Sequence, residues 1–116
     1  MKYEIIEIGE TKLPIRFGFT ALRKFSRKTG STLNDLNKLS NGEMTFDHAF
    51  ILIYCGIEDG HRKAKQSFKY SIDEITDLFD GKMDCMQKAF EVLGRAMNEG
   101  MSGNEKAKKA KKSNKS

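Results

Sequence analysis

The stretch Leu13–Gly30 limits the fold of this chain more than any other, because an extended segment there leads directly into a helix. Leu13, Ile15 and Phe17 lie on one face of a strand, and the apolar residues that follow have helical spacing. An earlier extended run, Tyr3–Ile8, is separated from this segment by a short turn that contains glycine. The chain is therefore expected to begin with a β-hairpin that feeds a helix.

The two strands of this hairpin differ in their patterns. In the first strand, Tyr3 and Ile5 share one face. Ile6 and Ile8 share the other face, which fits either a strand that is apolar on both sides or a bulge. Pro14, the only proline of the chain, has no backbone donor, so the second strand is expected to have an open edge or a bulge at that position.

Helical patterns occupy most of the remaining chain. The first helix is expected to start at Phe19 or Thr20 and to end at Thr29, with Gly30 as its left-handed cap. The other expected helices are a short one capped by Ser31 with Leu33, Leu36 and Leu39 on its apolar side, one from Phe46 to about Glu58 capped by Thr45, one begun by the capping box of Ser71 and Glu74 and ended at Asp80-Gly81, and one from about Met83 to Asn98.

The helix expected at Phe46–Glu58 is apolar on most of its sides. Such a helix is either the centre of a fold or keeps one side for a partner, and both alternatives stay open here. A turn is expected after it at Asp59-Gly60, followed by a polar and basic segment that reaches Tyr70.

The net charge of +5 is confined to one end of the chain. The last sixteen residues hold six lysines against Glu105, whereas the first hundred hold fifteen residues of each sign. Residues 101–116 are rich in Lys, Ala, Ser, Asn and Gly, a composition that cannot offset the entropy of ordering. We therefore expect one domain over residues 1–100 and a disordered tail over residues 101–116.

The tail has two physical interpretations. As a flexible cation it would contact phosphates weakly and without sequence preference, and as a solvated terminus it would only keep the protein in solution. It carries no aromatic residue or arginine, which argues against stacking on bases or bidentate readout. The lysines that would contact phosphate are Lys106, Lys108, Lys109, Lys111 and Lys112.

Nothing in the sequence supports catalysis or a cofactor. His48 and His61 are the only histidines, and neither belongs to a recognised metal-ligand spacing. Neither a glycine-rich phosphate loop nor a serine–histidine–aspartate order is present. No cofactor, metal or catalytic residue is expected.

Composition also bears on the compartment. Cys55 and Cys85 lie in apolar helical patterns. Two buried free thiols in a reducing cytosol are therefore a simpler interpretation than a disulfide. The N-terminus has no apolar signal region, and the longest apolar run, Ala49–Ile57, falls well short of the roughly 20 residues that span a bilayer. A cytoplasmic protein without membrane contact is expected.

The hairpin and first helix resemble those of the tail assembly chaperones of long-tailed bacteriophages and their relatives in gene transfer agents. In that family a strand pair ends in a Phe-Gly step and leads into a helix with an Ala-Leu, Phe and Thr-Gly pattern. The corresponding residues here are Phe17-Gly18, Ala21-Leu22, Phe25 and Thr29-Gly30. Weaker similarity extends over residues 3–98, through the segments Gly56–Gly60 and Ser71–Asp80.

The resemblance implies a protein that binds the tape measure protein and helps recruit tail tube subunits in the host cytoplasm, and that is absent from the mature virion. Binding would be reversible burial of apolar helix surface, without bond chemistry. The partner-binding residues expected on this basis are Phe50, Tyr54, Met86, Phe90, Leu93 and Met97. The last four also have the spacing of an ordinary helix core, and a core role is the preferred interpretation of that spacing.

The family also has short and long forms produced by ribosomal slippage. The pairs Lys108-Lys109 and Lys111-Lys112 are compatible with an A-rich slip site. A heptameric slip sequence around codons 106–112, with a second open frame beyond it, would support this hypothesis, and the absence of both would remove it.

The expected fold is α+β and mainly α, with an N-terminal β-hairpin, a small bundle of about five helices and a disordered basic tail. The expected function is that of a non-catalytic tail assembly chaperone. The alternative is a small nucleic-acid-binding or regulatory protein that uses the basic tail, and a small enzyme is the third hypothesis. Self-association is also expected, because a two-stranded hairpin and an apolar helix in so short a chain favour a shared core.

Overall fold

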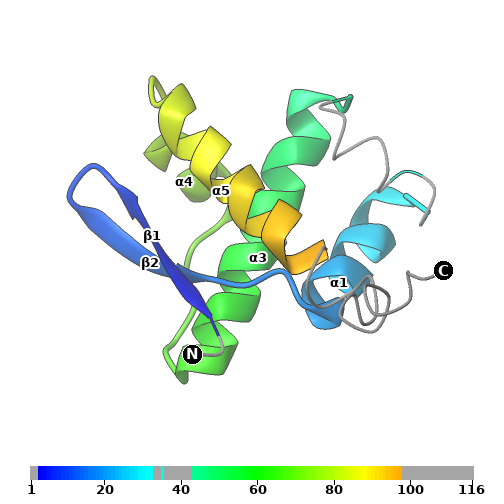
Figure 1. Ribbon diagram of the computed structural model, residues 1–116, viewed down its shortest axis with the longest axis horizontal. Helices are drawn as coiled ribbons and strands as arrows, with labels where there is room; N and C mark the ends of the chain where they lie inside the picture. Colours follow the sequence, from blue (N-terminus) through cyan, green and yellow to red (C-terminus); the bar gives the residue numbers. More distant parts are fainter. Residues whose placement is uncertain (1–2, 33–34, 36–42, 98–116) are drawn as a thin grey trace, which may run out of the picture.

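The computed structural model describes residues 3–32, 35 and 43–97 (Figure 1). The chain forms a two-stranded antiparallel hairpin followed by four helices in the described part, so it is α+β and mainly helical, as expected. The expectation of about five helices is corrected to four there. The elements are β1 (Glu4–Ile8), β2 (Thr11–Ile15), α1 (Phe19–Thr29), α3 (Phe46–Ala64), α4 (Ile72–Leu78) and α5 (Met83–Ala96).

Two expected features lie outside the described residues. One is most of the short leucine-rich helix, including Leu33, Leu36 and Leu39. The other is the lysine-rich tail, residues 101–116, with all five lysines that were assigned to phosphate contact. Its predicted disorder stays a prediction.

The hairpin has a regular register. Ile6 pairs with Leu13, and Ile8 pairs with Thr11 across a two-residue loop. Gly9 opens that loop at φ 64°, a conformation that glycine adopts without steric cost, as in the tight turns that suit hairpins. No residue is skipped between the strands, so the irregular pattern of β1 does not reflect a bulge. Instead, one face is buried in the core, and Ile5 on the other face is half exposed.

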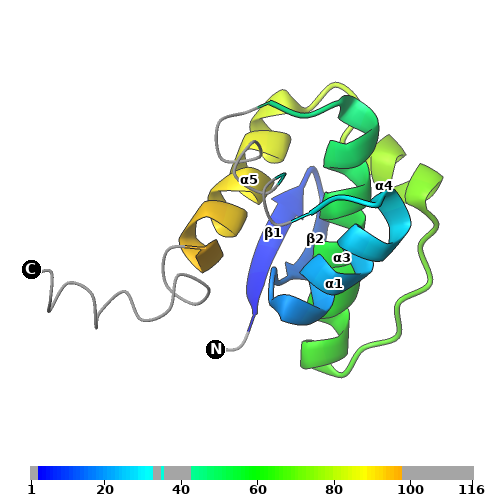
Figure 2. The same cartoon turned by 90° about the vertical axis from the view of Figure 1, so that its right-hand side faces the viewer.

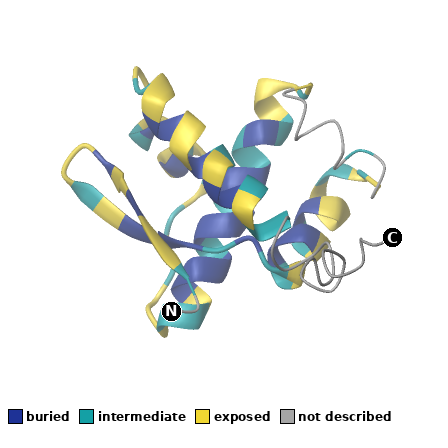
Figure 3. Ribbon diagram, viewed as in Figure 1, coloured by how far each residue is buried: buried dark blue, intermediate teal, exposed yellow. Residues whose placement is uncertain are grey.

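Helix α3 is the centre of the fold. It contacts α1, β2 and α4, while α5 packs against β1 (Figure 2). Buried residues occur along most of α3, and they are the dark blue segments of this helix in Figure 3. Leu52, Ile53, Cys55 and Ile57 have no exposed surface, and they form one continuous core with residues of every other described element.

The end of α3 differs from the expectation. The helix continues through Asp59 and Gly60 to Ala64, instead of ending near Glu58 with a turn. Gly60 faces the backbone of Pro14, which a Cβ atom at position 60 would overlap. A Cβ atom on Gly56 would likewise lie 2.5 Å from the Phe17 ring. These glycines allow β2 and the residues after it to approach the helix, so they serve packing within a helix rather than a turn.

Helix caps follow the sequence signals in three places. Gly30 ends α1 at φ 75°, with its N–H donating to the carbonyl of Ser26. Thr45 accepts a hydrogen bond from the His48 N–H at the start of α3, and Ser71 starts α4 within a complete capping box. These bonds satisfy backbone groups that have no partner inside the helix.

Thr32 and Asp35 exchange two hydrogen bonds just after the end of α1, next to the cap expected at Ser31. Thr32 Oγ1 accepts from the Asp35 N–H at 3.3 Å, and Asp35 Oδ2 accepts from the Thr32 N–H at 2.9 Å. The Ser31 hydroxyl instead accepts from Thr29 Oγ1 at 2.8 Å. The reciprocal pair at Thr32 leaves Ser31 to stabilise the end of α1.

Candidate functional site

Asp59 is the most deeply buried charged residue that the structure describes, with 2% of its surface exposed. Its Oδ2 accepts from Arg16 Nη1 at 3.1 Å and from the Gly18 N–H at 3.3 Å. Its Oδ1 accepts from Arg62 Nε at 3.1 Å and from Nη2 at 2.7 Å. Oδ2 therefore holds the β2–α1 connection to α3, and Oδ1 is paired within α3. This cluster is structural, because both carboxylate oxygens of Asp59 already accept hydrogen bonds within the protein.

A second cluster surrounds His61 near the end of α3. Its Nδ1 lies 2.8 Å from the carbonyl oxygen of Ile57, and its ring packs against the rings of Phe68 and Tyr70 at 5.1 and 6.1 Å between centroids. The sequence pattern between Asp59 and Tyr70 predicts only a polar and basic segment. It does not indicate that Phe68 and Tyr70 pack against His61. Their alternation in an extended stretch was the available signal.

Three aromatic residues follow one side of α3 at four-residue intervals. They are Phe46, Phe50 and Tyr54, and we refer to them as the aromatic line. Phe46 is 68% exposed, and the other two are only partly buried. Residues spaced by four lie on the same helix face, so the line is a single surface. An exposed phenylalanine that continues into further aromatic surface is typical of a binding site.

The aromatic line runs between neighbours on both sides of α3. The Tyr54 ring contacts Phe68, with 5.2 Å between centroids, and Lys28 Nζ of α1 lies 5.7 Å from its centre. The Phe50 ring lies 6.1 Å from that of Phe79, which caps α4. The line is thus bordered by α1 on one side and by α4 and the segment before it on the other.

The two bordering helices carry opposite charges. Between residues 19 and 30 the chain has four basic residues and no acidic one, and between 71 and 80 it has four acidic residues and no basic one. We call the first set the basic flank, and it consists of Arg23, Lys24, Arg27 and Lys28. We call the second set the acidic flank, and it consists of Asp73, Glu74, Asp77 and Asp80.

Burial shapes the electrostatics around Tyr54. Loss of solvent raises the pKa of its phenol, and the nearby Glu58 carboxylate and Cys55 raise it further. Burial also raises the pKa of the Cys55 thiol to about 11, although the ammonium groups of Lys28 and Lys24 act in the opposite direction. At neutral pH, Tyr54 therefore offers an uncharged hydroxyl group beside an aromatic ring, which suits an apolar partner with a few polar groups.

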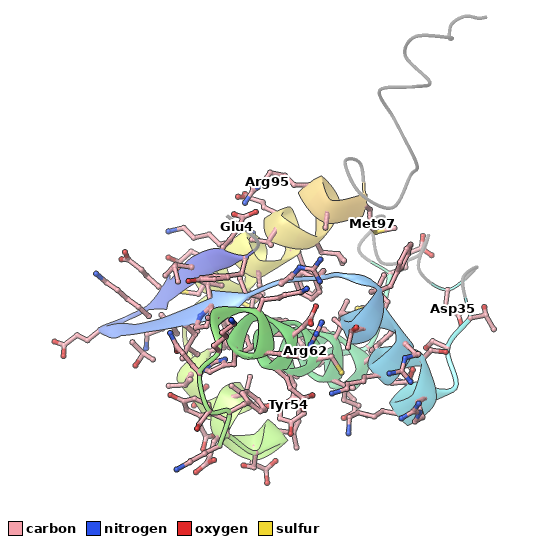
Figure 4. The ribbon with its side chains drawn as sticks, turned by 90° about the horizontal axis from the view of Figure 1, so that it is seen from below. Glu4, Asp35, Tyr54, Arg62, Arg95 and Met97 are labelled. Atoms are coloured by element: carbon pink, nitrogen blue, oxygen red, sulfur yellow. The ribbon has the colours of Figure 1, made fainter. Side chains whose placement is uncertain are left out.

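The structure separates the residues predicted to bind a partner. Phe50 and Tyr54 belong to the aromatic line, whereas Phe90 and Met97 are partly buried residues of α5 and its C-terminal cap. Tyr54 and Met97 lie on different sides of α3 in Figure 4. Six residues therefore do not form one surface.

Met86 and Leu93 are corrected to core residues. They are 7% and 2% exposed, and they belong to the core together with Cys85, Ala89 and Val92 of the same helix, which packs against β1. Burial of these side chains removes them from any surface that this conformation offers. The core interpretation stated for this helix holds for these two residues.

Other kinds of site can be described briefly. Within residues 3–32, 35 and 43–97, no group of three His, Cys, Asp or Glu side chains could hold a metal ion. Cys55 and Cys85 are both buried free thiols. Of the helices in the described part, none has the length and apolar character needed to cross a membrane. Comparison with models of known families, with curated proteins and with solved structures gives no match.

Proposed function

We propose that this protein is a non-catalytic tail assembly chaperone that binds a tape measure protein through the aromatic line. The observation that carries the proposal is the run of Phe46, Phe50 and Tyr54 along one side of α3, with Phe46 68% exposed. An amphipathic helix laid on this surface would bury apolar side chains of both proteins. The resemblance of the hairpin and first helix to that family supports the same function.

The proposal places the protein in the host cytoplasm during assembly, outside the mature virion. A tape measure protein is a long, largely helical chain, and its apolar stripes would aggregate if they stayed exposed. Reversible binding to the aromatic line would keep such stripes apart until tail tube subunits arrive. The surface needs no titratable or metal-binding group for this purpose.

The test is coexpression with a tape measure protein, which the proposal predicts to be encoded near this gene. We expect the wild-type chain to copurify with it and to increase its soluble fraction. Phe46→Ser should reduce recovery of the complex by a factor of about ten or more. The reason is that an aromatic anchor in an interface often contributes about 2 kcal/mol to the free energy of binding.

A matched control is available at the start of α1. Phe19 is the first residue of its helix, as Phe46 is of α3, and it is 70% exposed. Phe19→Ser should therefore leave the complex intact. Absence of binding by the wild-type chain, or an equal loss in both variants, would contradict the proposal.

A further inference from the structure

The face that carries the aromatic line has a border of each charge sign. Lys28, in the basic flank, lies over the Tyr54 ring, and Phe79 joins the line to the helix of the acidic flank. Among the described residues, Arg27, Asp77 and Asp80 have no ion-pair partner. These three exposed charges lie in the two flanks that border the line, and no ion pair within the described part of the chain neutralises them.

A face of this kind is complementary to itself. If a two-fold axis passed through the middle of the aromatic line, the α1 side of each copy would lie against the α4 side of the other. The interface would therefore contain this contact two times. Each contact would then join a basic flank to an acidic flank, and the exposed ring of Phe46 would be covered. Borders of equal sign would repel each other under the same rotation.

We propose that a second copy of this chain covers the aromatic line in a two-fold symmetric dimer, with α1 of each copy against α4 of the other. A second copy is favoured over an unrelated protein because both halves of the charge pattern are present on this chain. The dimer and the tape measure complex would use the same surface, so binding of the tape measure protein would require the dimer to dissociate. The test of the dimer uses the chain alone, so its outcome does not depend on the proposed function.

The test uses charge reversal in the full-length chain. Arg27→Glu with Lys28→Glu cancels the net charge of the basic flank, and Asp77→Lys with Asp80→Lys cancels that of the acidic flank. Either change also places like charges opposite each other at the substituted positions. Sedimentation velocity from about 1 to about 100 µM should show dimers of the wild-type chain and at least about tenfold weaker association of either variant alone. An equimolar mixture of the two variants should recover dimers, since the mixed pair again joins opposite charges.

The mixture separates loss of the interface from loss of the fold, because misfolded variants would not recover specific dimers. Glu10→Lys with Lys12→Glu changes charges at the hairpin and should leave the dimer intact. Phe46→Ser should weaken association without a change of charge, whereas Phe19→Ser should not.

Three results would overturn the inference. The first is a wild-type chain that stays monomeric over the whole range, which would leave the aromatic line to a different protein. The second is that each charge-reversed variant alone dimerises as strongly as the wild-type chain. The third is a mixture of folded variants, as judged by circular dichroism, that fails to associate.

Discussion

Asp59 shows how one buried carboxylate determines the junction between the hairpin and the helices. It receives hydrogen bonds from Arg16, Gly18 and Arg62, which belong to the β2–α1 connection and to α3. A charge this deep is tolerated only when its oxygens are paired, and each guanidinium supplies a charged donor. The arginine side chains are 32% and 48% exposed, so solvent screens part of the attraction.

Asp59→Asn should lower the free energy of unfolding by about 2–3 kcal/mol. The amide has one acceptor oxygen instead of two, and its NH₂ group would face an arginine. Urea denaturation followed by circular dichroism measures the loss. Glu58→Gln is the control, because the Glu58–Lys24 pair is partly exposed at 3.4 Å and should contribute less than about 1 kcal/mol. Equal losses in both variants would contradict this account of Asp59.

Cys55 should be unreactive toward thiol reagents in the folded protein at pH 8. Its side chain is fully buried, and burial raises its pKa from 9.0 to about 11, so the thiol rather than the nucleophilic thiolate is present. The folded state holds this proton more tightly than the unfolded state. The resulting contribution to stability is complete below about pH 9 and is lost as the pH rises toward 11.

A Cys85→Ala variant isolates this thiol for measurement. Labelling of the folded variant with a chromogenic disulfide should be at least about a hundredfold slower than in urea, because labelling then requires opening of the core. Rapid labelling at pH 8 without denaturant would show that Cys55 is accessible and would contradict the packing described for α3.

At the scale of elements, the contact between α3 and β2 depends on the absence of a side chain. Gly60→Ala should destabilise the protein by about 2–3 kcal/mol, because its methyl group would overlap the backbone of Pro14 and Ile15. Backbone atoms cannot rotate away as a flexible side chain can, so β2 would have to move from the helix.

Gly94→Ala is the matched control within a helix. A Cβ atom there has no other atom within 4 Å, and alanine favours helix over glycine by about 1 kcal/mol. We therefore expect Gly94→Ala to stabilise the protein by about 0.5–1 kcal/mol in the same denaturation experiment. A stabilising Gly60→Ala would show that β2 and α3 are not in close contact.

At the scale of the whole molecule, the net charge and the candidate binding face are separate. The charge excess lies in residues 101–116, whereas the aromatic line and both flanks lie between residues 19 and 80. The chaperone hypothesis therefore assigns binding to the body, and the nucleic-acid hypothesis assigns it to the tail.

Deletion of residues 101–116 distinguishes the two hypotheses. The shortened chain should keep its tape measure binding and dimerisation, with an unfolding midpoint within about 1 °C of the full chain. Weak binding of the full chain to DNA at low salt should disappear, because the counterion-releasing lysines are gone. Loss of tape measure binding in the shortened chain, measured by copurification, would favour the tail as the functional region.

Much of the architecture follows from signals within a few residues of each other. Gly30, Thr45 and the Ser71–Glu74 box set helix ends through bonds to nearby backbone, so their roles were readable in the sequence. The hairpin was readable for the same reason, since its strands are joined by a two-residue loop. The aromatic line was recognised in part, because Phe50 and Tyr54 stood out on a helix that was apolar on most sides.

The remaining features depend on residues that are distant in the chain. In the sequence, Gly60 has the pattern of a turn residue and Asp59 that of a surface charge. Only the structure shows that Gly60 lies against the backbone of Pro14 and that Asp59 pairs with Arg16. Met86 and Leu93 have the spacing of a binding stripe, and only the position of α5 on the hairpin makes them core. Residue type and helical spacing therefore defined the elements and a set of candidate surfaces. The tertiary structure determined which of those surfaces stay exposed, because the exposure of a side chain depends on which elements pack over it.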